Sequence, residues 1–88
     1  MNDNLEKAYT FAKHGGGINF PDEYIKAYST IREAIEKIEA TENVKIVMRL
    51  RYLDGLNFNE IASKMKITYQ WVYELHKIGI KKVSKYRG

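Results

Sequence analysis

The sequence lacks the residues on which several common kinds of site depend. It has no cysteine, which excludes disulfides and thiolate metal sites. Its two histidines, His14 and His76, are too few and too far apart to predict a zinc site. No apolar run approaches the roughly 18 residues of a membrane span, and the polar N-terminal residues do not resemble a signal peptide. We therefore expect a cytoplasmic protein without a metal, a cofactor or a membrane segment.

Residues that interrupt helices are also scarce. The chain of 88 residues has one proline and six glycines, and no segment shows the alternation of a strand. A chain of this length forms one domain with a thin core, and the sequence predicts an all-α fold, a small helical bundle. It has no Ser-His-Asp set and no clustered carboxylates in its basic half, so we do not expect an enzyme.

The N-terminal segment, residues 1–20, is predicted to form a short helix and a hinge. The helix is expected over residues 3–13, with Asp3 as its cap and Glu6 three residues later, as in a capping box. Three glycines at 15–17 then end it. Such a run binds phosphate when it lies between a strand and a helix, and no strand precedes it here, so we interpret it as a flexible hinge.

Four further helices are predicted in the rest of the chain, residues 21–88. Each starts at a residue that favours a helix N-terminus, either a proline in the first turn or a side chain that can cap. The expected helices are 22–40 after Pro21, 41–53 from Thr41, 57–65 from Asn57 and 69–86 after Thr68.

The helix predicted at 22–40 has one apolar face with alternating spacings of four and three residues, the pattern of a coiled-coil seam. The seam lasts barely two heptads, which favours packing within the chain. Alternatively, two copies of the chain joined through the seam would bind DNA more tightly than one, because the second contact gains from effective concentration. This argument favours a homodimer with the seam as its interface. The seam residues are Tyr24, Tyr28, Ile31, Ile35 and Ile38.

Charge divides the chain into an acidic and a basic half. Residues 1–44 carry five basic and eight acidic side chains, a net charge of −3, whereas residues 45–88 carry ten basic and three acidic side chains, a net charge of +7. This asymmetry indicates contact with a polyanion on the C-terminal side only.

Residues 58–77, FNEIASKMKITYQWVYELHK, have the pattern of a helix-turn-helix. The small Ala62 suits the close crossing of two helices, Ile67 fills the turn, and apolar residues three apart follow. Lys66 stands where this turn often has glycine, and a lysine in a left-handed turn costs about 1 kcal/mol. We predict a helix-turn-helix at 57–84. The alternative is a helical hairpin that binds no DNA.

The segment VMRLRYLDGLNFNEIASKMKITYQWVYELHKIGIKKV resembles region four of bacterial sigma factors, in which an arginine-rich helix precedes a helix-turn-helix. The phrases RYLDGLNFNEIA and VYELHKIGIKK are similar to those of small phage-encoded regulators of the RinA and ArpU type. The resemblance covers about residues 40–86, and residues 1–20 match no family. It implies a sequence-specific transcriptional regulator that binds double-stranded DNA, encoded by a phage or another mobile element. Gly79 stands where the family usually has alanine.

Helical geometry assigns the faces of the last helix independently of any family. At about 100° per residue, Val72, Leu75, Gly79 and Val83 share one side, which we expect to be buried. The opposite side would enter a major groove, where glutamine can pair with adenine, glutamate with cytosine, and tyrosine with a thymine methyl or a phosphate. The predicted base contacts are Tyr69, placed there by the resemblance, and Gln70, Tyr73 and Glu74.

Cations around this helix, and the free N–H groups at its start, are predicted to bind phosphate. For the two arginines of the preceding helix, a salt bridge of one of them with Glu60 or Asp54 is an equal alternative. The predicted phosphate contacts are Arg49, Arg51, Lys64, Lys66, Thr68, Lys77 and Lys81.

Three more residues of this helix receive separate interpretations. His76 points toward the inner side, so we expect a buried, hydrogen-bonded histidine rather than a base contact. Trp71 and Ile78 lie between the two faces and are predicted either to contact the 22–40 helix or to form a patch for a partner. The patch belongs to the second function that we consider, an interaction protein that binds RNA polymerase or another regulator and inhibits or redirects it.

Overall fold

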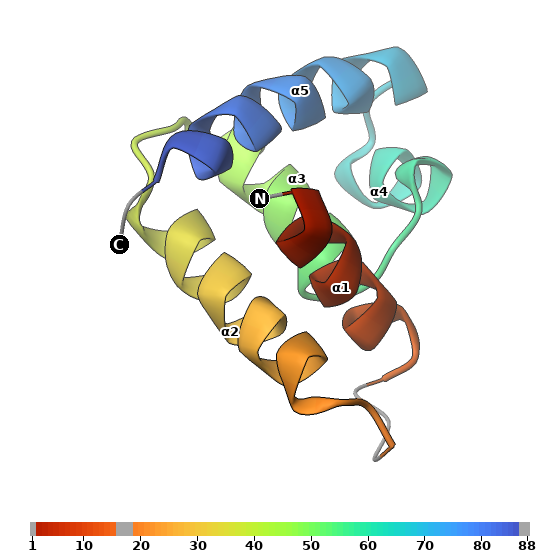
Figure 1. Cartoon of the computed structure of the whole chain (residues 1–88). Helices are drawn as coiled ribbons and strands as arrows, with labels where there is room; N and C mark the ends of the chain where they lie inside the picture. Colours follow the sequence, from red (N-terminus) through yellow and green to blue (C-terminus); the bar gives the residue numbers. More distant parts are fainter. Residues whose placement is uncertain (1, 16–18, 87–88) are drawn as a thin grey trace.

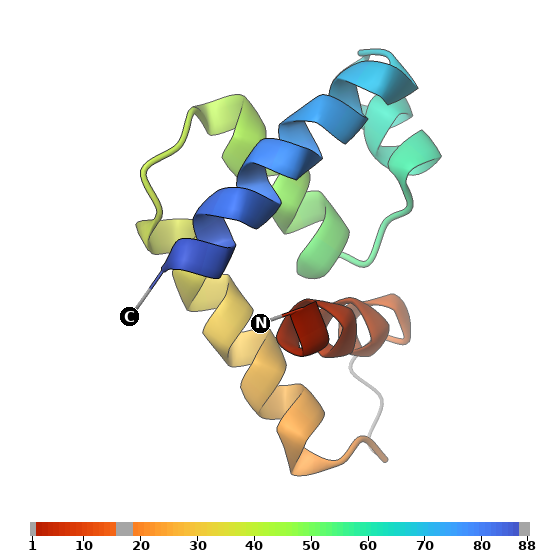
Figure 2. The same ribbon diagram turned by 45° about the horizontal axis from the view of Figure 1, so that its top comes forward.

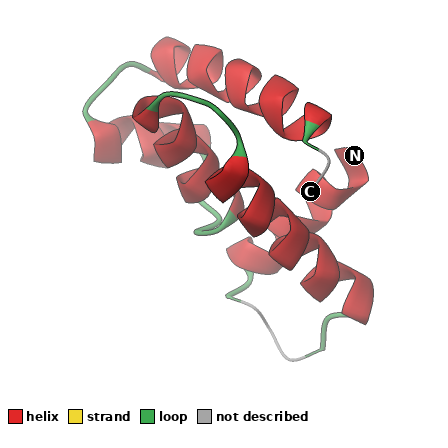
Figure 3. Cartoon of the chain, turned by 90° about the vertical axis from the view of Figure 1, so that its left-hand side faces the viewer, coloured by secondary structure: helices red, strands yellow, loops and turns green. Residues whose placement is uncertain are grey.

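A computed structural model describes residues 2–15 and 19–86, and over these residues the only regular secondary structure is α-helix, joined by short loops (Figures 1 and 3). The all-α prediction is confirmed. In the part of the chain that the structure describes, no helix is long and apolar enough to cross a membrane. The helices are α1 (Asn2–Lys13), α2 (Asp22–Lys37), α3 (Glu42–Tyr52), α4 (Phe58–Met65) and α5 (Tyr69–Lys85).

All five helices share one hydrophobic core. Each contributes a completely buried side chain to a single cluster, so α1 packs as part of the same domain as the rest of the chain. The predicted glycine hinge falls mostly outside the described residues, and of its three glycines only Gly15 is described, with a φ of 69°. The five buried side chains, one from each helix in order, are Ala8, Ile35, Val47, Ile61 and Val72.

Two boundaries in the first half differ from the sequence prediction. Helix α1 begins at Asn2, so Asp3 lies inside its first turn and does not cap it; there its carboxylate interacts favourably with the positive end of the helix dipole. Helix α2 ends at Lys37, and Ile38 is extended, with a ψ of 151°. The chain leaves the helix there because Ile38 turns into the core, where it is buried, before the connection to α3.

The helix starts in the second half are those predicted. Thr41, Asn57 and Thr68 cap α3, α4 and α5, and each side-chain oxygen accepts a hydrogen bond from the backbone N–H three residues later. The carboxylate of Glu60 in turn accepts a hydrogen bond from the backbone N–H of Asn57, which completes a capping box. Each cap satisfies an N–H group that would otherwise lack a partner, and typically stabilises a helix by about 1 kcal/mol.

The apolar seam of α2 is largely used inside the chain, where α2 packs against α1 and α3 (Figure 2). Ile31, Ile35 and Ile38 are buried. Tyr28 donates a hydrogen bond from its hydroxyl to the carbonyl of Leu53, 3.1 Å away. The folded chain therefore does not offer these three isoleucines to a second copy, which corrects the prediction of a dimer interface along the seam; Tyr24, the remaining seam residue, is half-buried.

Candidate nucleic-acid interface

A tight turn of three residues joins α4 to α5. Lys66 adopts the left-handed conformation, with φ 60° and ψ 43°, and the N–H of Ile67 donates to the carbonyl of Ala62 at 3.1 Å. Thr68 then caps α5. The lysine thus occupies the position at which the sequence predicted a left-handed residue, and its side chain is exposed.

The two faces of α5 are those expected from the helical wheel. Its inner residues, from Val72 through Leu75 and Gly79 to Val83, are buried. Gly79 lies against α3, because a Cβ built on it would overlap the side chain of Met48. On the opposite side of the helix, the outward residues form an exposed stripe, which we call the outward stripe. Its members are Gln70, Tyr73, Glu74, Lys77 and Lys81.

Charges on this stripe partly compensate one another. Lys77 Nζ lies 3.6 Å from a carboxylate oxygen of Glu74, and 5.3 Å from the centre of the Tyr73 ring. The pair is exposed, so it contributes less than about 1 kcal/mol to stability. In the free protein, Lys77 therefore screens the charge of Glu74, the residue predicted to contact cytosine. On DNA, Lys77 could move to a phosphate.

Phe58, the first residue of α4, supports the two outward tyrosines. Its ring is edge-on to Tyr69, with centroids 5.8 Å apart, and to Tyr73, with centroids 6.4 Å apart. Both tyrosines are about half exposed. Both rings thus rest on the same phenylalanine, and the exposure of Tyr69 places it with the outward residues. Phe58 is not among the residues that the sequence predicted for the interface.

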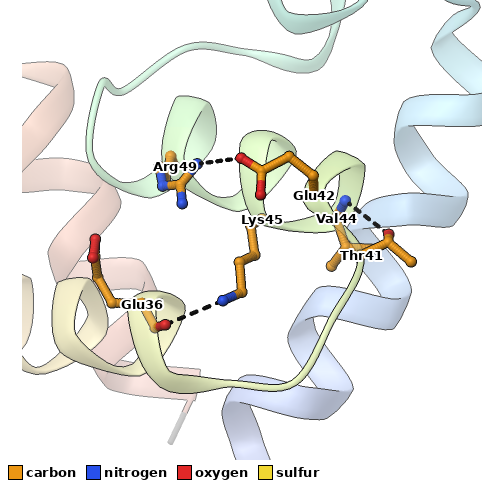
Figure 4. Close-up of polar contacts among 6 residues, drawn as sticks. All are labelled: Glu36, Thr41, Glu42, Val44, Lys45 and Arg49. Carbon is orange, nitrogen blue, oxygen red and sulfur yellow. Dashed lines mark hydrogen bonds and ion pairs between the residues drawn. The ribbon is translucent and has the colours of Figure 1, made fainter.

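The predicted phosphate contacts separate into exposed lysines and occupied arginines. Lys64, Lys66, Lys77 and Lys81 are exposed. Arg49 reaches along α3 to Glu42, with 3.4 Å between nitrogen and oxygen (Figure 4). Within the described structure, neither arginine pairs with Glu60 or Asp54, so that alternative is wrong.

Arg51 is enclosed, which argues against its predicted role as a phosphate contact. Its guanidinium carbon lies 3.9 Å from the centre of the Tyr9 ring and 4.5 Å from that of Phe58. It donates a hydrogen bond to the carbonyl of Leu56 at 3.3 Å, and its Nε is buried without a hydrogen-bond partner among the described residues. Two rings and a carbonyl therefore already engage the guanidinium, although part of the residue stays exposed.

His76 is half-buried and hydrogen-bonded, as predicted. Its Nε2 lies 2.8 Å from the hydroxyl of Tyr52, and the two rings are stacked. Burial, with a smaller contribution from the nearby charge of Arg51, lowers the pKa of His76 to about 4. The imidazole is therefore neutral at pH 7 and is not a cation of the interface. Burial likewise raises the pKa of Tyr52.

Trp71 and Ile78 are exposed, at 50% and 46% of their surface. They line an open groove of about 710 Å³ between α5 and the segment that leads into α3, together with Ala40, Val44 and Leu75. The groove that they line contains no residue of α2 (Asp22–Lys37), although Glu39 and Ala40 of the predicted 22–40 helix border it. The groove is mainly apolar and adjoins the start of the outward stripe.

No family model, curated protein or solved structure matches this chain. The resemblance to sigma region four therefore stays a prediction, and the function is argued from the residues and their geometry.

Proposed function

We propose that this protein is a sequence-specific double-stranded DNA-binding regulator of transcription that inserts α5 into the major groove. The observation that supports it most directly is the exposed stripe of α5, opposite a fully buried inner face and preceded by a tight turn. A helix held by its inner face and free along its outer face suits the groove of B-form DNA. Regulation in the cytoplasm of a bacterial host, by a protein of phage or mobile-element origin, follows from the resemblance.

The chemistry of the stripe suits base recognition. Gln70 can pair bidentately with adenine, and Glu74 can accept a hydrogen bond from the amino group of cytosine once Lys77 has moved away. Tyr69 and Tyr73 offer ring edges to thymine methyls and hydroxyls to phosphates. Bases are read near the N-terminal end of a recognition helix, and these four residues occupy the first two turns of α5.

Affinity is assigned mainly to four exposed lysines and to the start of α5. Lys64, Lys66, Lys77 and Lys81 border the turn and the stripe. The N–H groups that follow Thr68 and point out of the helix start add a partial positive charge for one phosphate. Four neutralised phosphates imply a slope of about −3 to −4 in a plot of log affinity against log salt concentration.

Selection from a random 20-base-pair duplex library tests the proposal. Fluorescence anisotropy then measures the selected duplex and single-base variants of it. Gln70→Ala and Glu74→Ala should each relax preference at a different position, by about 1–3 kcal/mol. Lys81→Ala should weaken all duplexes equally and flatten the salt slope by about 0.9. Lys26→Ala, which removes an exposed lysine of α2 in the acidic half, is the matched control and should change neither.

Two results would contradict the proposal. Absence of binding to any duplex at 50–100 mM salt, where about four phosphate contacts still hold, would remove DNA as the partner. Equal effects of Gln70→Ala, Glu74→Ala and Lys81→Ala on every duplex would show that the outward stripe does not read bases.

The groove at Trp71 and Ile78 favours a second function, an interaction protein that binds RNA polymerase or another regulator and inhibits or redirects it. Two large apolar side chains, each about half exposed, line the same groove, and such patches mark protein contacts. Polymerase capture by the wild type, lost in Trp71→Ser and kept in Gln70→Ala, would support this function. This second function would be excluded if the wild type binds DNA and neither the wild type nor Gln70→Ala captures polymerase.

A further inference from the structure

A column of side chains in contact with one another connects the N-terminal helix to the predicted base-reading tyrosines. Its first step is Tyr9 of α1, whose ring covers the guanidinium of Arg51 at 3.9 Å. The same guanidinium carbon is 4.5 Å from the centre of the Phe58 ring on α4. Phe58 in turn lies edge-on to Tyr69 and Tyr73 of α5. We call these five side chains the column.

The column cannot shift freely at its base, because α1 is fixed to the connection between α3 and α4. A Cβ built on Gly55 would lie 2.6 Å from Cα of Lys13 in α1, and Gly55 has a φ of 74°. The two backbones therefore touch at this point. Leu5 and Ala8 anchor the same helix in the core. The position of Tyr9 is thus determined by α1 docking, and Tyr9 and Phe58 both contact the guanidinium of Arg51.

We propose that α1 controls the base preference of α5 through this column, with Tyr9, Arg51 and Phe58 as positioning residues for Tyr69 and Tyr73. The inference rests on the proposed DNA-binding function. A ring supported from behind loses part of its rotamer freedom before the DNA arrives, and a contact made at the edge of a base needs a narrow range of orientation. Loosening the column therefore costs discrimination between sequences and leaves the attraction to phosphates unchanged.

The position of the cations separates this role from a general effect on affinity. The exposed lysines assigned to phosphates, Lys64, Lys66, Lys77 and Lys81, belong to α4, α5 and the turn between them. Arg51, the cation of the column, is enclosed and occupied by two rings and a carbonyl. A change at Tyr9 therefore alters the support of the two tyrosines without removing a charge from the interface.

The decisive comparison is between Tyr9→Leu and Tyr9→Phe in the full chain. Phenylalanine keeps the ring over Arg51, whereas leucine keeps apolar volume and removes the ring. The probes are the duplex selected by the wild type from a random 20-base-pair library, its single-base variants and unselected library DNA. Tyr9→Leu should lose about three- to tenfold discrimination at the base pairs nearest Tyr69 and Tyr73. Its affinity for unselected DNA and its salt slope should stay those of the wild type, and Tyr9→Phe should match the wild type throughout.

A measurement on the free protein tests the column without DNA. With 3-fluorotyrosine incorporated, the ¹⁹F resonances of Tyr69 and Tyr73, assigned through Tyr69→Phe and Tyr73→Phe, should shift and sharpen in Tyr9→Leu and stay in place in Tyr9→Phe. Phe58→Leu, which breaks the column above Arg51, should move them in the same way. If circular dichroism shows that Tyr9→Leu does not fold, Phe58→Leu takes its place in both measurements.

The outcomes distinguish the inference from the function on which it rests. A wild type that selects no duplex overturns the proposed function, and the ¹⁹F shifts then decide whether the column holds the tyrosines. A wild type that selects a duplex while Tyr9→Leu keeps full discrimination, or while the two resonances stay unmoved, overturns the inference alone. Equal loss of affinity for selected and unselected DNA in Tyr9→Leu also overturns it, since α1 would then act only on the stability of the fold.

Discussion

Replacing Lys66 with glycine is expected to stabilise the fold and to weaken binding to DNA. Among the described residues, Lys66 is the only one other than glycine with a positive φ, 60°. The left-handed conformation costs a residue with a side chain about 1–2 kcal/mol. Glycine avoids that cost but loses about 0.5–1 kcal/mol through the greater freedom of its unfolded chain. With mid-range values of both contributions, the free energy of unfolding should therefore rise by about 0.5–1 kcal/mol.

Thermal denaturation followed by circular dichroism measures the first effect. For a domain of this size, about 1 kcal/mol corresponds to a change in Tm of about 4–8 °C, so Lys66→Gly should melt about 2–8 °C higher than the wild type. Anisotropy with a duplex measures the second effect. Loss of one phosphate contact should flatten the salt slope by about 0.9.

Lys66→Asn is the matched variant, because asparagine has no charge yet tolerates the left-handed region better than lysine does. It should flatten the salt slope as much as Lys66→Gly and raise the Tm less. A lower Tm in Lys66→Gly would refute the argument from backbone strain. An unchanged salt slope in both variants would mean that the turn between α4 and α5 does not approach a phosphate, which would contradict the proposed docking.

Three further predictions concern the core. Burial holds the pKa of His76 at about 4 against its usual 6.5, so the neutral imidazole stabilises the fold above pH 6.5, and this contribution is lost as the pH falls to about 4. In His76→Gln the amide can still accept a hydrogen bond from Tyr52 but does not titrate. Urea unfolding at pH 7 and pH 4 should therefore show that this variant loses about 1–2 kcal/mol less stability between the two pH values than the wild type does. Gly79→Ala should cost about 1 kcal/mol because its Cβ meets Met48, yet should be stabilising in Met48→Ala, as a double-mutant cycle would measure. Ile31→Asp should unfold the chain, since Ile31 is 1% exposed. If circular dichroism and light scattering instead show that the variant is a folded monomer, the hypothesis of a dimer through the seam of α2 would again be supported.

The parts of the fold that sequence predicted well are those governed by neighbouring residues. A cap depends on a side chain and an N–H three residues away, so Thr41, Asn57 and Thr68 identify their helices without reference to the rest of the chain. The inner face of α5 follows from helical periodicity in the same way. The end of α2 at Lys37 depends instead on where Ile38 meets the core, and neither the seam nor the charges of α2 contain that information.

The candidate site shows the same division between local and distant causes. A helical wheel gives the direction in which Tyr69 and Tyr73 leave α5, but the ring that supports them belongs to Phe58, one helix earlier. Likewise, counting charges credits Arg51 to the basic half, although a ring from α1, 42 residues earlier in the sequence, covers it. A basic residue in an arginine-rich segment next to a helix-turn-helix pattern looks like a phosphate contact as long as only sequence neighbours are considered. The enclosing aromatic rings instead make Arg51 a link between α1 and the interface, and this is why the exposed lysines, rather than the arginines, should determine the salt dependence of DNA binding.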